Sequence, residues 1–344
     1  MKWKNKGHEF DNYWNEIKSV KEVYIFGAGL IGKSAIMLLE KDMKINAVLD
    51  NANSKLGHKC SSYEIISPNF AQKNIPVIVC VPPEVENEVE AQLSVLGLHF
   101  FDVHIFIPVY FMYKYSRLVI TSISYLPTTV CNLKCKNCLN FAPYLKHQEF
   151  RNIDTLKDDI DNFFGKVDYV MLFHVSGGEP LLYPDIGNLL SYIREKYGDR
   201  IARLETTTNG TVVPSEKLCN LFHELSIGVV LDDYTESLPE YKDRFKEIVH
   251  RFDGEGVDYR VQKADKWISL MTSDYLDDNL SLNERFEKCH VPWQEYRDGK
   301  LYLCNYSDYA AVAGLYKVQD NEYLCIENAV KKEIMEFRLG FSKK

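Results

Sequence analysis

Three cysteines lie close together in the middle of the chain, in the segment 131–138, which reads CNLKCKNC. Their spacing has the form C-x3-C-x2-C, and thiolates are the usual protein ligands of iron–sulfur clusters. Three thiolates on one loop can hold three irons of a [4Fe–4S] cube and leave the fourth iron open to a small molecule. We therefore expect a metal centre on Cys131, Cys135 and Cys138.

Two other interpretations of these cysteines stay open. A structural zinc site needs four ligands, and no further Cys or His lies at a short distance, since His147 is not at a finger-like spacing. A buried helical stripe is the second alternative, because positions i, i+4 and i+7 share one face of a helix. The asparagines and lysines between the cysteines favour a loop at a site.

Strands and helices alternate around this loop, as a parallel sheet requires. The sequence predicts strands at residues 118–121, 169–175, 202–207, 228–231 and 257–261. It predicts the intervening helices at residues 156–164, 186–197, 215–225 and 240–251. These units are too few to close an eight-stranded barrel, so we expect an open, partial (β/α)6 barrel. Active groups gather at the carboxyl ends of such strands, where the patterned motifs fall.

Two further motifs follow predicted strands, GGEP at residues 177–180 and TTNG at residues 207–210. Together with the cysteine motif they resemble the radical S-adenosylmethionine (radical SAM) superfamily, over roughly residues 118–310. The resemblance implies that SAM is bound by the GGEP and TTNG segments, namely by Gly177, Gly178, Glu179, Thr208 and Asn209. The glycines would allow close backbone approach, and the glutamate offers an anionic acceptor to the amino group of SAM.

The resemblance also implies a mechanism. SAM would bind the open iron, one electron from the reduced cluster would cleave it to a 5′-deoxyadenosyl radical, and the radical would take hydrogen from a substrate. A flavodoxin or ferredoxin is then expected as electron donor. Relatives often carry a functional Asp after the fourth strand, where Asp232 and Asp233 lie, but no catalytic residue is assigned. One departure is Asn137, where many relatives have an aromatic residue, so the adenine contact is expected from Phe141 or Tyr144.

Two more cysteines lie near the carboxyl end, Cys289 and Cys304, in a C-x9-G-x4-C pattern. This pattern resembles the opening of SPASM and twitch modules, which implies an auxiliary iron–sulfur cluster. Asp298-Gly299 predicts a hairpin turn between the two cysteines. Relatives supply further cysteines after this pair, whereas the present sequence has only Cys325 after Cys304. Three alternatives stay open: the sequence is a piece of a longer chain, Cys325 and a residue such as Asp308 complete the site, or the segment is a plain hairpin without a cluster.

The first part of the chain carries a glycine-rich turn. Strand 23–26 ends in Gly27, Gly29 and Gly32, a G-x-G-x-x-G pattern that continues into a helix at residues 33–39. Asp50 ends the next strand, at residues 47–49, where a ribose-binding acid is expected. A further strand at residues 76–81 and a helix at residues 84–96 complete a doubly wound pattern. The segment resembles Rossmann-like domains, and bound NAD, another nucleotide or nucleotide-sugar, and a ligand-free scaffold are all open.

Composition and charge bear on the partners and the location of the protein. The net charge of -8 argues against nucleic acid and anionic membranes as partners. The most apolar stretch, at about residues 100–120, is interrupted by charged residues and cannot span a bilayer. The first residues do not read as a signal peptide, so we expect a cytoplasmic protein. Isolated cysteines at positions 60, 80 and 219 are interpreted as buried structural residues.

The expected organisation is α/β, with a Rossmann-like domain at residues 1–112, a radical SAM partial barrel at 113–280 and a twitch-like module at 281–344. The leading hypothesis is an enzyme that oxidises or epimerises a carbohydrate or a nucleotide-linked sugar. A peptide- or protein-modifying maturase is the alternative, and a non-catalytic iron–sulfur or nucleotide sensor is a third reading. Formation of 5′-deoxyadenosine from SAM separates the sensor from both enzymes.

Overall fold

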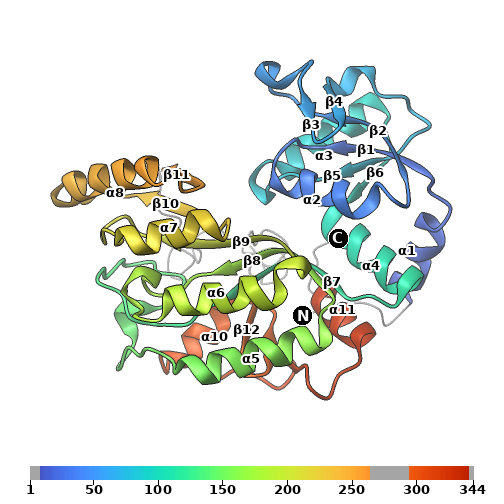
Figure 1. The fold of residues 1–344 in the computed structure, drawn as a ribbon. Coiled ribbons are helices and arrows are strands. Elements are labelled where there is room, and N and C mark those ends of the chain that lie inside the picture. Colours follow the sequence, from blue (N-terminus) through green and yellow to red (C-terminus); the bar gives the residue numbers. More distant parts are fainter. Residues whose placement is uncertain (1–7, 264–293, 341–344) are drawn as a thin grey trace, which may run out of the picture. The chain divides into compact units, whose positions relative to one another are not determined.

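The computed structural model describes residues 8–263 and 294–340. The chain divides into two compact units (Figure 1). Residues up to Thr121, together with the segment that starts at Lys331, form the first unit, and Ser122–Val330 form the second. The last residues therefore belong with the first part of the chain and not with the segment that precedes them.

A six-stranded sheet forms the centre of the first unit, in the order β3-β4-β2-β1-β5-β6. Its inner strands β1 (Glu22–Phe26), β2 (Lys44–Leu49) and β5 (Val77–Val79) pair in parallel. Strands β4 (Tyr63–Ile66) and β6 (Phe100–Asp102) pair in parallel with β2 and β5, and the short edge strand β3 (Lys59–Cys60) pairs antiparallel with β4. The glycine-rich turn follows β1, at the carboxyl end of a central strand.

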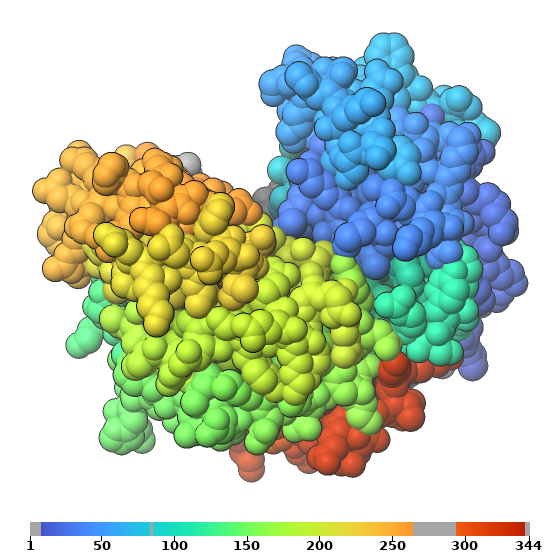
Figure 2. Space-filling view, in the orientation of Figure 1, coloured from blue at the N-terminus to red at the C-terminus, as the bar shows by residue number. Residues whose placement is uncertain are grey.

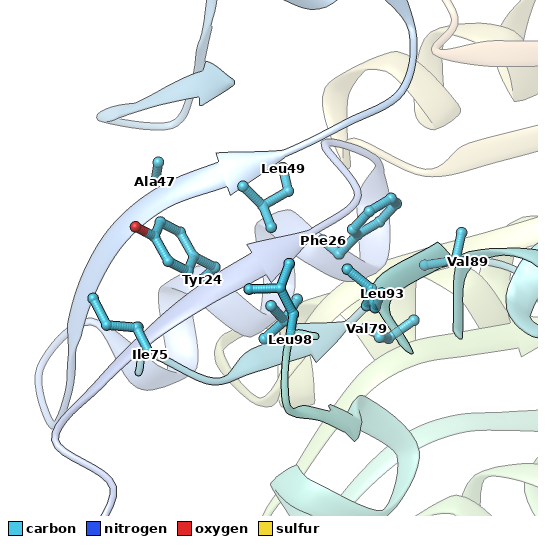
Figure 3. Close-up of a cluster of buried hydrophobic side chains, with 10 residues drawn as sticks. Tyr24, Phe26, Ala47, Leu49, Ile75, Val79, Val89, Leu93 and Leu98 are labelled. Atoms are coloured by element: carbon cyan, nitrogen blue, oxygen red, sulfur yellow. The ribbon is translucent and has the colours of Figure 1, made fainter. Parts of the chain in front are cut away.

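The described residues of this unit form the α-helices α1 (Glu9–Ile17), α2 (Leu30–Leu39), α3 (Pro83–Leu96), α4 (Val103–Tyr115) and α11 (Lys331–Leu339). Helix α3 starts at a proline and is capped after Leu96 by Gly97, whose φ of 69° suits the left-handed cap position. Its Val89 and Leu93 pack with Phe26 and Leu49 of the sheet, as Figure 3 shows. Burial of this apolar face attaches the helix to the sheet.

An eight-stranded sheet forms the second unit, in the order β11-β10-β9-β8-β7-β12-β13-β14. Five strands lie side by side in chain order, β7 (Val119–Tyr125), β8 (Tyr169–Val175), β9 (Ile201–Thr208), β10 (Gly228–Asp233) and β11 (Tyr259–Lys263). The pairs from β8 to β11 are parallel, and β12 (Glu295–Arg297) pairs in parallel with β7. Strands β13 (Lys300–Tyr302) and β14 (Tyr323–Cys325) continue the sheet antiparallel.

Helices connect successive strands of this sheet and follow one another along it, as Figure 1 shows. They are α5 (Ile153–Lys166), α6 (Ile186–Tyr197), α7 (Glu216–Glu224) and α8 (Lys242–Gly254), and α10 (Asn305–Val312) follows β13. In Figure 2 the residues of α5 to α8, coloured green to orange, form an outer surface of this unit. Phe164 of α5 stacks on Phe173 of β8, at 5.8 Å between ring centroids. The apolar side of the sheet is thus buried against helices.

Most predicted elements are confirmed, with small shifts at their ends. The strand expected at 257–261 starts two residues later, at Tyr259, and the helix expected at 240–251 is α8, preceded by a short 3-10 turn at Pro239–Tyr241. The apolar stretch at 100–120 forms β6, α4 and the start of β7. Within the described ranges, no helix has both the length and the apolar character that crossing a membrane requires.

Candidate active site

The cysteine loop directly follows β7. Cys131, Cys135 and Cys138 are each partly exposed, and the amide of Cys138 donates to the carbonyl of Cys135 at 3.1 Å. Burial, with smaller contributions from the neighbouring Glu179, Cys138 and Cys135, raises the pKa of Cys131 to about 11. Burial, followed by Cys138, also raises the pKa of Cys135. The three sulfur atoms therefore share one electrostatic environment.

This donor set fits an iron–sulfur cluster. Thiols whose pKa values are raised by burial and by one another hold protons unless a cationic group binds them, and metal coordination deprotonates such thiols outright. Among residues 8–263 and 294–340, no three His, Cys, Asp or Glu side chains converge as the ligands of a single metal ion do. In a cube each thiolate binds a different iron, so its ligands need not converge on one point.

The glycine pair after β8 lies directly against the chain that leads into the cysteine loop. The amide of Gly178 donates to the Thr128 carbonyl at 2.9 Å, and the amide of Glu179 donates to the Val130 carbonyl at 2.7 Å. A Cβ atom on Gly178 would lie 2.2 Å from the Val130 oxygen, and one on Gly177, whose φ is 153°, would lie 2.7 Å from the Thr128 oxygen. Only glycine allows this approach, which positions the loop just before Cys131.

Glu179 is fully buried between the loops that follow β8 and β9. Its Oε1 accepts from the Leu181 amide at 3.0 Å and from the Thr208 hydroxyl at 2.8 Å, and its Oε2 accepts from the Asn209 amide at 2.7 Å. Burial raises the pKa of this carboxyl to about 7, against the effect of the three hydrogen bonds. The carboxylate predicted to meet the amino group of SAM thus makes its hydrogen bonds within the protein.

Asn209 brings the third motif to the cysteines. Its Nδ2 lies 3.8 Å from Cys131 Sγ and donates to Asn132 Oδ1 at 3.1 Å. Thr211, which is buried, donates its hydroxyl to Asn209 Oδ1 at 2.5 Å and accepts from Asn132 Nδ2 at 2.7 Å. The structure therefore brings the cysteine, GGEP and TTNG segments together, as their places after neighbouring parallel strands predict.

The end of β10 adds two residues to the site. Tyr234 donates its hydroxyl to Asp232 Oδ2 at 3.0 Å, and it interacts electrostatically with Cys135 and Cys138. Burial raises the pKa of Asp232 to about 6. Asp233 instead accepts from the amide and hydroxyl of Thr235, in its own turn. Tyr234 lies just after a predicted strand, and this position is the sequence signal that places it near a substrate.

One face of strands β8 and β9 carries polar side chains near the carboxyl ends of the two strands. His174 on β8 contacts Thr207 on β9, at 2.7 Å between Nε2 and Oγ1, and burial lowers the pKa of this histidine. Glu205, paired with His174 in the register, accepts from both Arg260 and Arg203 and is almost fully buried. These side chains lie on the face opposite the buried Phe173 and Leu204, since successive residues alternate along a strand.

The two aromatic residues expected to contact adenine differ in exposure. Phe141 is buried in an apolar cluster with Leu126, Tyr309 and Ala310, and its ring lies 4.6 Å from that of Tyr306. Tyr144 is 38% exposed and donates its hydroxyl to the Lys136 carbonyl at 3.0 Å. Of the pair, Tyr144 is therefore the residue with surface still available to a ligand.

The carboxyl-terminal cysteines are placed only in part, because Cys289 lies outside the described residues. The predicted hairpin is confirmed: β12 and β13 pair antiparallel around Asp298 and Gly299, with φ of 50° and 73°. Cys304 precedes α10, whereas Cys325 pairs with Lys300 at the opposite end of β13. At ~3.3 Å per residue this separation is on the order of 10 Å, too far for Cys304 and Cys325 to bind one iron.

The glycine-rich turn of the first unit has the geometry of its motif. A Cβ on Gly27 would lie 2.6 Å from the Cys80 oxygen and one on Gly32 would lie 1.9 Å from the Gly27 oxygen, whereas nothing lies within 4 Å of one on Gly29. Asp50 is 7% exposed and accepts from the Ala28 amide, the Ala52 amide and Lys55 Nζ. Asp50, the acid expected to bind ribose, thus forms a hydrogen bond with the glycine-rich turn itself, through the Ala28 amide. The isolated cysteines Cys60, Cys80 and Cys219 are buried, as expected.

Comparison with known proteins matches residues 125–278 to the radical SAM superfamily. The Fe-coproporphyrin III synthase of Methanosarcina barkeri is 32% identical over 129 residues, which are 37% of this chain and 30% of that protein. The GTP 3′,8-cyclase 3 of Mycobacterium bovis is 32% identical over 91 residues, 25% of this chain and 23% of that protein. The chain thus spans less than a third of the length of these curated relatives.

A solved structure described as "Native anSMEcpe with bound AdoMet" covers 64% of this chain and 84% of its own, with 15% identity and a TM-score of 0.43.

Proposed function

We propose, from the premise that residues 125–278 form a radical SAM domain, that this protein is an enzyme that uses SAM to take hydrogen from a small-molecule substrate. The observation that carries the proposal is the meeting of the cysteine, GGEP and TTNG segments at the carboxyl ends of β7, β8 and β9. A [4Fe–4S] cluster bound there would supply the electron that cleaves SAM to a 5′-deoxyadenosyl radical.

The chain's own residues would bind and orient the reactants. Cys131, Cys135 and Cys138 would hold three irons, and the turn at Gly177 and Gly178 would keep their loop in place. Thr208 and Asn209 lie at the carboxyl end of β9, next to the cysteine loop, and would contact SAM once it is bound. Glu179 would stabilise the loops after β8 and β9, because its carboxylate accepts hydrogen bonds from each of them.

Asp232 is proposed to handle a proton on the substrate side. Its pKa of about 6 leaves it ionised near neutral pH yet able to hold a proton for a short time, which suits a general base. Tyr234 donates to one of its oxygens and so fixes the direction of the carboxylate. The 5′-deoxyadenosyl radical would take a hydrogen atom and Asp232 a proton, and the one electron left on the substrate would return to the iron–sulfur cluster held by the three cysteines, giving an oxidised product.

The substrate class proposed is a carbohydrate or a nucleotide-linked sugar. Two features support it: the polar face around His174, Glu205 and Thr207, and the glycine-rich turn of the first unit, where Gly29 leaves room for a phosphate. This first unit is proposed to be Rossmann-like, on its parallel β2-β1-β5 core. Thermal-shift titration with NAD, NADP and UDP- or dTDP-sugars tests the ligand, and no shift with any of them would favour a scaffold.

The test of the enzyme proposal is anaerobic reconstitution followed by incubation with SAM and dithionite. We expect about four irons per chain and formation of 5′-deoxyadenosine in the unchanged protein. The triple Cys131→Ala, Cys135→Ala, Cys138→Ala variant should lose both. Cys219→Ala is the matched control, since this buried thiol belongs to α7 and not to the cysteine loop. A triple variant that keeps its iron and cleaves SAM overturns the proposal.

The same iron measurement tests an auxiliary cluster. About four irons per chain would leave no iron for a second site, whereas about eight, reduced to about four by Cys304→Ala, would support one. Reduction by flavodoxin or by ferredoxin in place of dithionite tests the proposed electron donor. A peptide substrate that accelerates 5′-deoxyadenosine formation, where sugars do not, would favour the maturase alternative.

A further inference from the structure

The side chain of Asn209 is aimed at the first cysteine of the loop. Its Nδ2 lies 3.8 Å from Cys131 Sγ, within the range of a hydrogen bond to sulfur. The backbone amide of Leu133 also donates to this sulfur, at 3.4 Å. Asn209 lies 78 positions further along the chain than Cys131, so only the fold brings the two together.

The direction of the Asn209 amide is determined by Thr211. The backbone amide of Thr211 donates to Asn209 Oδ1 at 3.1 Å, and its hydroxyl donates to the same atom at 2.5 Å. A backbone N–H can only donate, so the oxygen of Asn209 must face Thr211. The nitrogen must then face the cysteine loop, where it meets Asn132 Oδ1 at 3.1 Å and Cys131 Sγ.

The backbone of Asn209 is held as firmly as its side chain. Its amide donates to Oε2 of Glu179 at 2.7 Å, and Glu179 is fully buried. The preceding Thr208 is also buried and donates to the other oxygen of the same carboxylate. Asn209 is therefore a donor whose position and direction are set before any cluster binds, with little entropy left to lose.

We infer that Asn209 raises the reduction potential of the cluster by donating an N–H···S hydrogen bond to the Cys131 thiolate, an inference that rests on the proposed function. Reduction adds negative charge to the cluster and its thiolates. A donor stabilises that charge, and hydrogen bonds to the sulfurs are among the factors that set iron–sulfur potentials. The role differs from contact with SAM, because it acts on the cluster in the absence of SAM.

The experiment is a midpoint titration of the reconstituted cluster, followed by EPR and performed without SAM. In Asn209→Leu, which keeps the size of the side chain and removes the donor, we expect a more negative midpoint. A tenfold lower ratio of reduced to oxidised cluster at a given applied potential corresponds to about 59 mV for a one-electron couple. Thr211→Val, which loosens the amide without removing it, should give a smaller shift in the same direction.

Asn140→Leu is the matched control. Asn140 belongs to the same loop region, but its Nδ2 donates to the Gly177 carbonyl at 2.7 Å and not to a cysteine. Its loss should leave the midpoint unchanged. If Asn140→Leu shifts the midpoint as much as Asn209→Leu does, the effect is general loosening of the loop, and the inference is wrong.

The remaining outcomes separate the inference from the proposed function. A wild-type cluster that cleaves SAM, with an unchanged midpoint in Asn209→Leu, overturns the inference alone. If Asn209→Leu changes the Kd for SAM but not the midpoint, the inference is also overturned, and Asn209 is then a contact of SAM. If Asn209→Leu fails to load iron, the midpoint of Thr211→Val is measured in its place. A more negative midpoint then supports the inference, and an unchanged midpoint overturns it. A wild-type chain that assembles no cluster overturns both proposals.

Discussion

Gly178 lies so close to Val130 that a Cβ atom on the glycine would come within 2.2 Å of the valine carbonyl oxygen. Two hydrogen bonds, from the amides of Gly178 and Glu179, hold the segments at this separation. The contact joins the turn after β8 to the residue that immediately precedes Cys131. The shape of the cysteine loop therefore depends on a residue that makes no contact through a side chain.

Gly178→Ala should reduce iron incorporation several-fold. The added methyl group meets backbone atoms that cannot move aside without displacing the loop, a strain that costs about 1–3 kcal/mol. Iron per chain after reconstitution and the far-UV circular dichroism spectrum are the measurements. Gly165→Ala is the control, because nothing lies within 4 Å of a Cβ at that helical position. Normal iron content in Gly178→Ala would contradict the argument.

Substitutions at two glycines of the first unit should differ in their effect on thermal stability. Gly32→Ala places a methyl group 1.9 Å from the Gly27 carbonyl oxygen, so we expect it to lower Tm by several degrees, or to prevent folding of the unit. Gly29→Ala meets nothing within 4 Å and should leave Tm nearly unchanged. Calorimetry of both variants checks this. If a nucleotide stabilises the wild type, Gly29→Ala should weaken that effect by crowding the phosphate.

Asp159→Ala should destabilise the second unit by about 3 kcal/mol. This buried carboxylate accepts from the amides of Asp298 and Gly299 in the β12–β13 turn, at 3.0 and 2.8 Å, and from Arg151 at 3.3 Å. Its loss leaves buried donors unpaired. Asp258→Ala, which removes an exposed partner of Arg203, should cost about 0–1 kcal/mol. Equal losses in urea unfolding of the two variants would show that the turn is not held by Asp159.

Glu295→Gln should change how stability depends on pH. Burial, followed by Asp308, raises the pKa of Glu295 well above its usual value, so the folded protein holds a proton that the unfolded chain releases above about pH 4.5. The unfolded state then binds fewer protons, and the free energy of unfolding falls as pH rises from there towards the folded pKa. Glutamine keeps the shape and cannot ionise, so the decline should be shallower in the variant.

Urea unfolding at several pH values between about 5 and 8 measures this difference. Part of the decline should remain in Glu295→Gln, because burial also raises the pKa of the neighbouring Asp308 to about 6. The wild-type and variant curves should be closest at the acidic end and diverge as pH increases. Parallel curves across this range would mean that Glu295 is ionised in the folded protein.

The sequence by itself determined the features that depend on local pattern. The order of strands and helices from β7 to β11 follows from alternating apolar runs, and the Asp298-Gly299 turn follows from the backbone preferences of its two residues. The cysteine, GGEP and TTNG motifs were recognisable because each is contiguous. Their convergence was predictable as well, because the carboxyl ends of neighbouring parallel strands meet at one edge of a sheet.

Only the tertiary structure decided which atoms of these motifs meet. The contact of Asn209 with Cys131 spans 78 positions and that of Asp159 with Gly299 spans 140, and no local pattern encodes either. Glu179, expected to face SAM, is buried among protein donors because the loops after β8 and β9 close over it. Such pairings depend on strand register and close packing, in which each position is fixed by many distant neighbours at once.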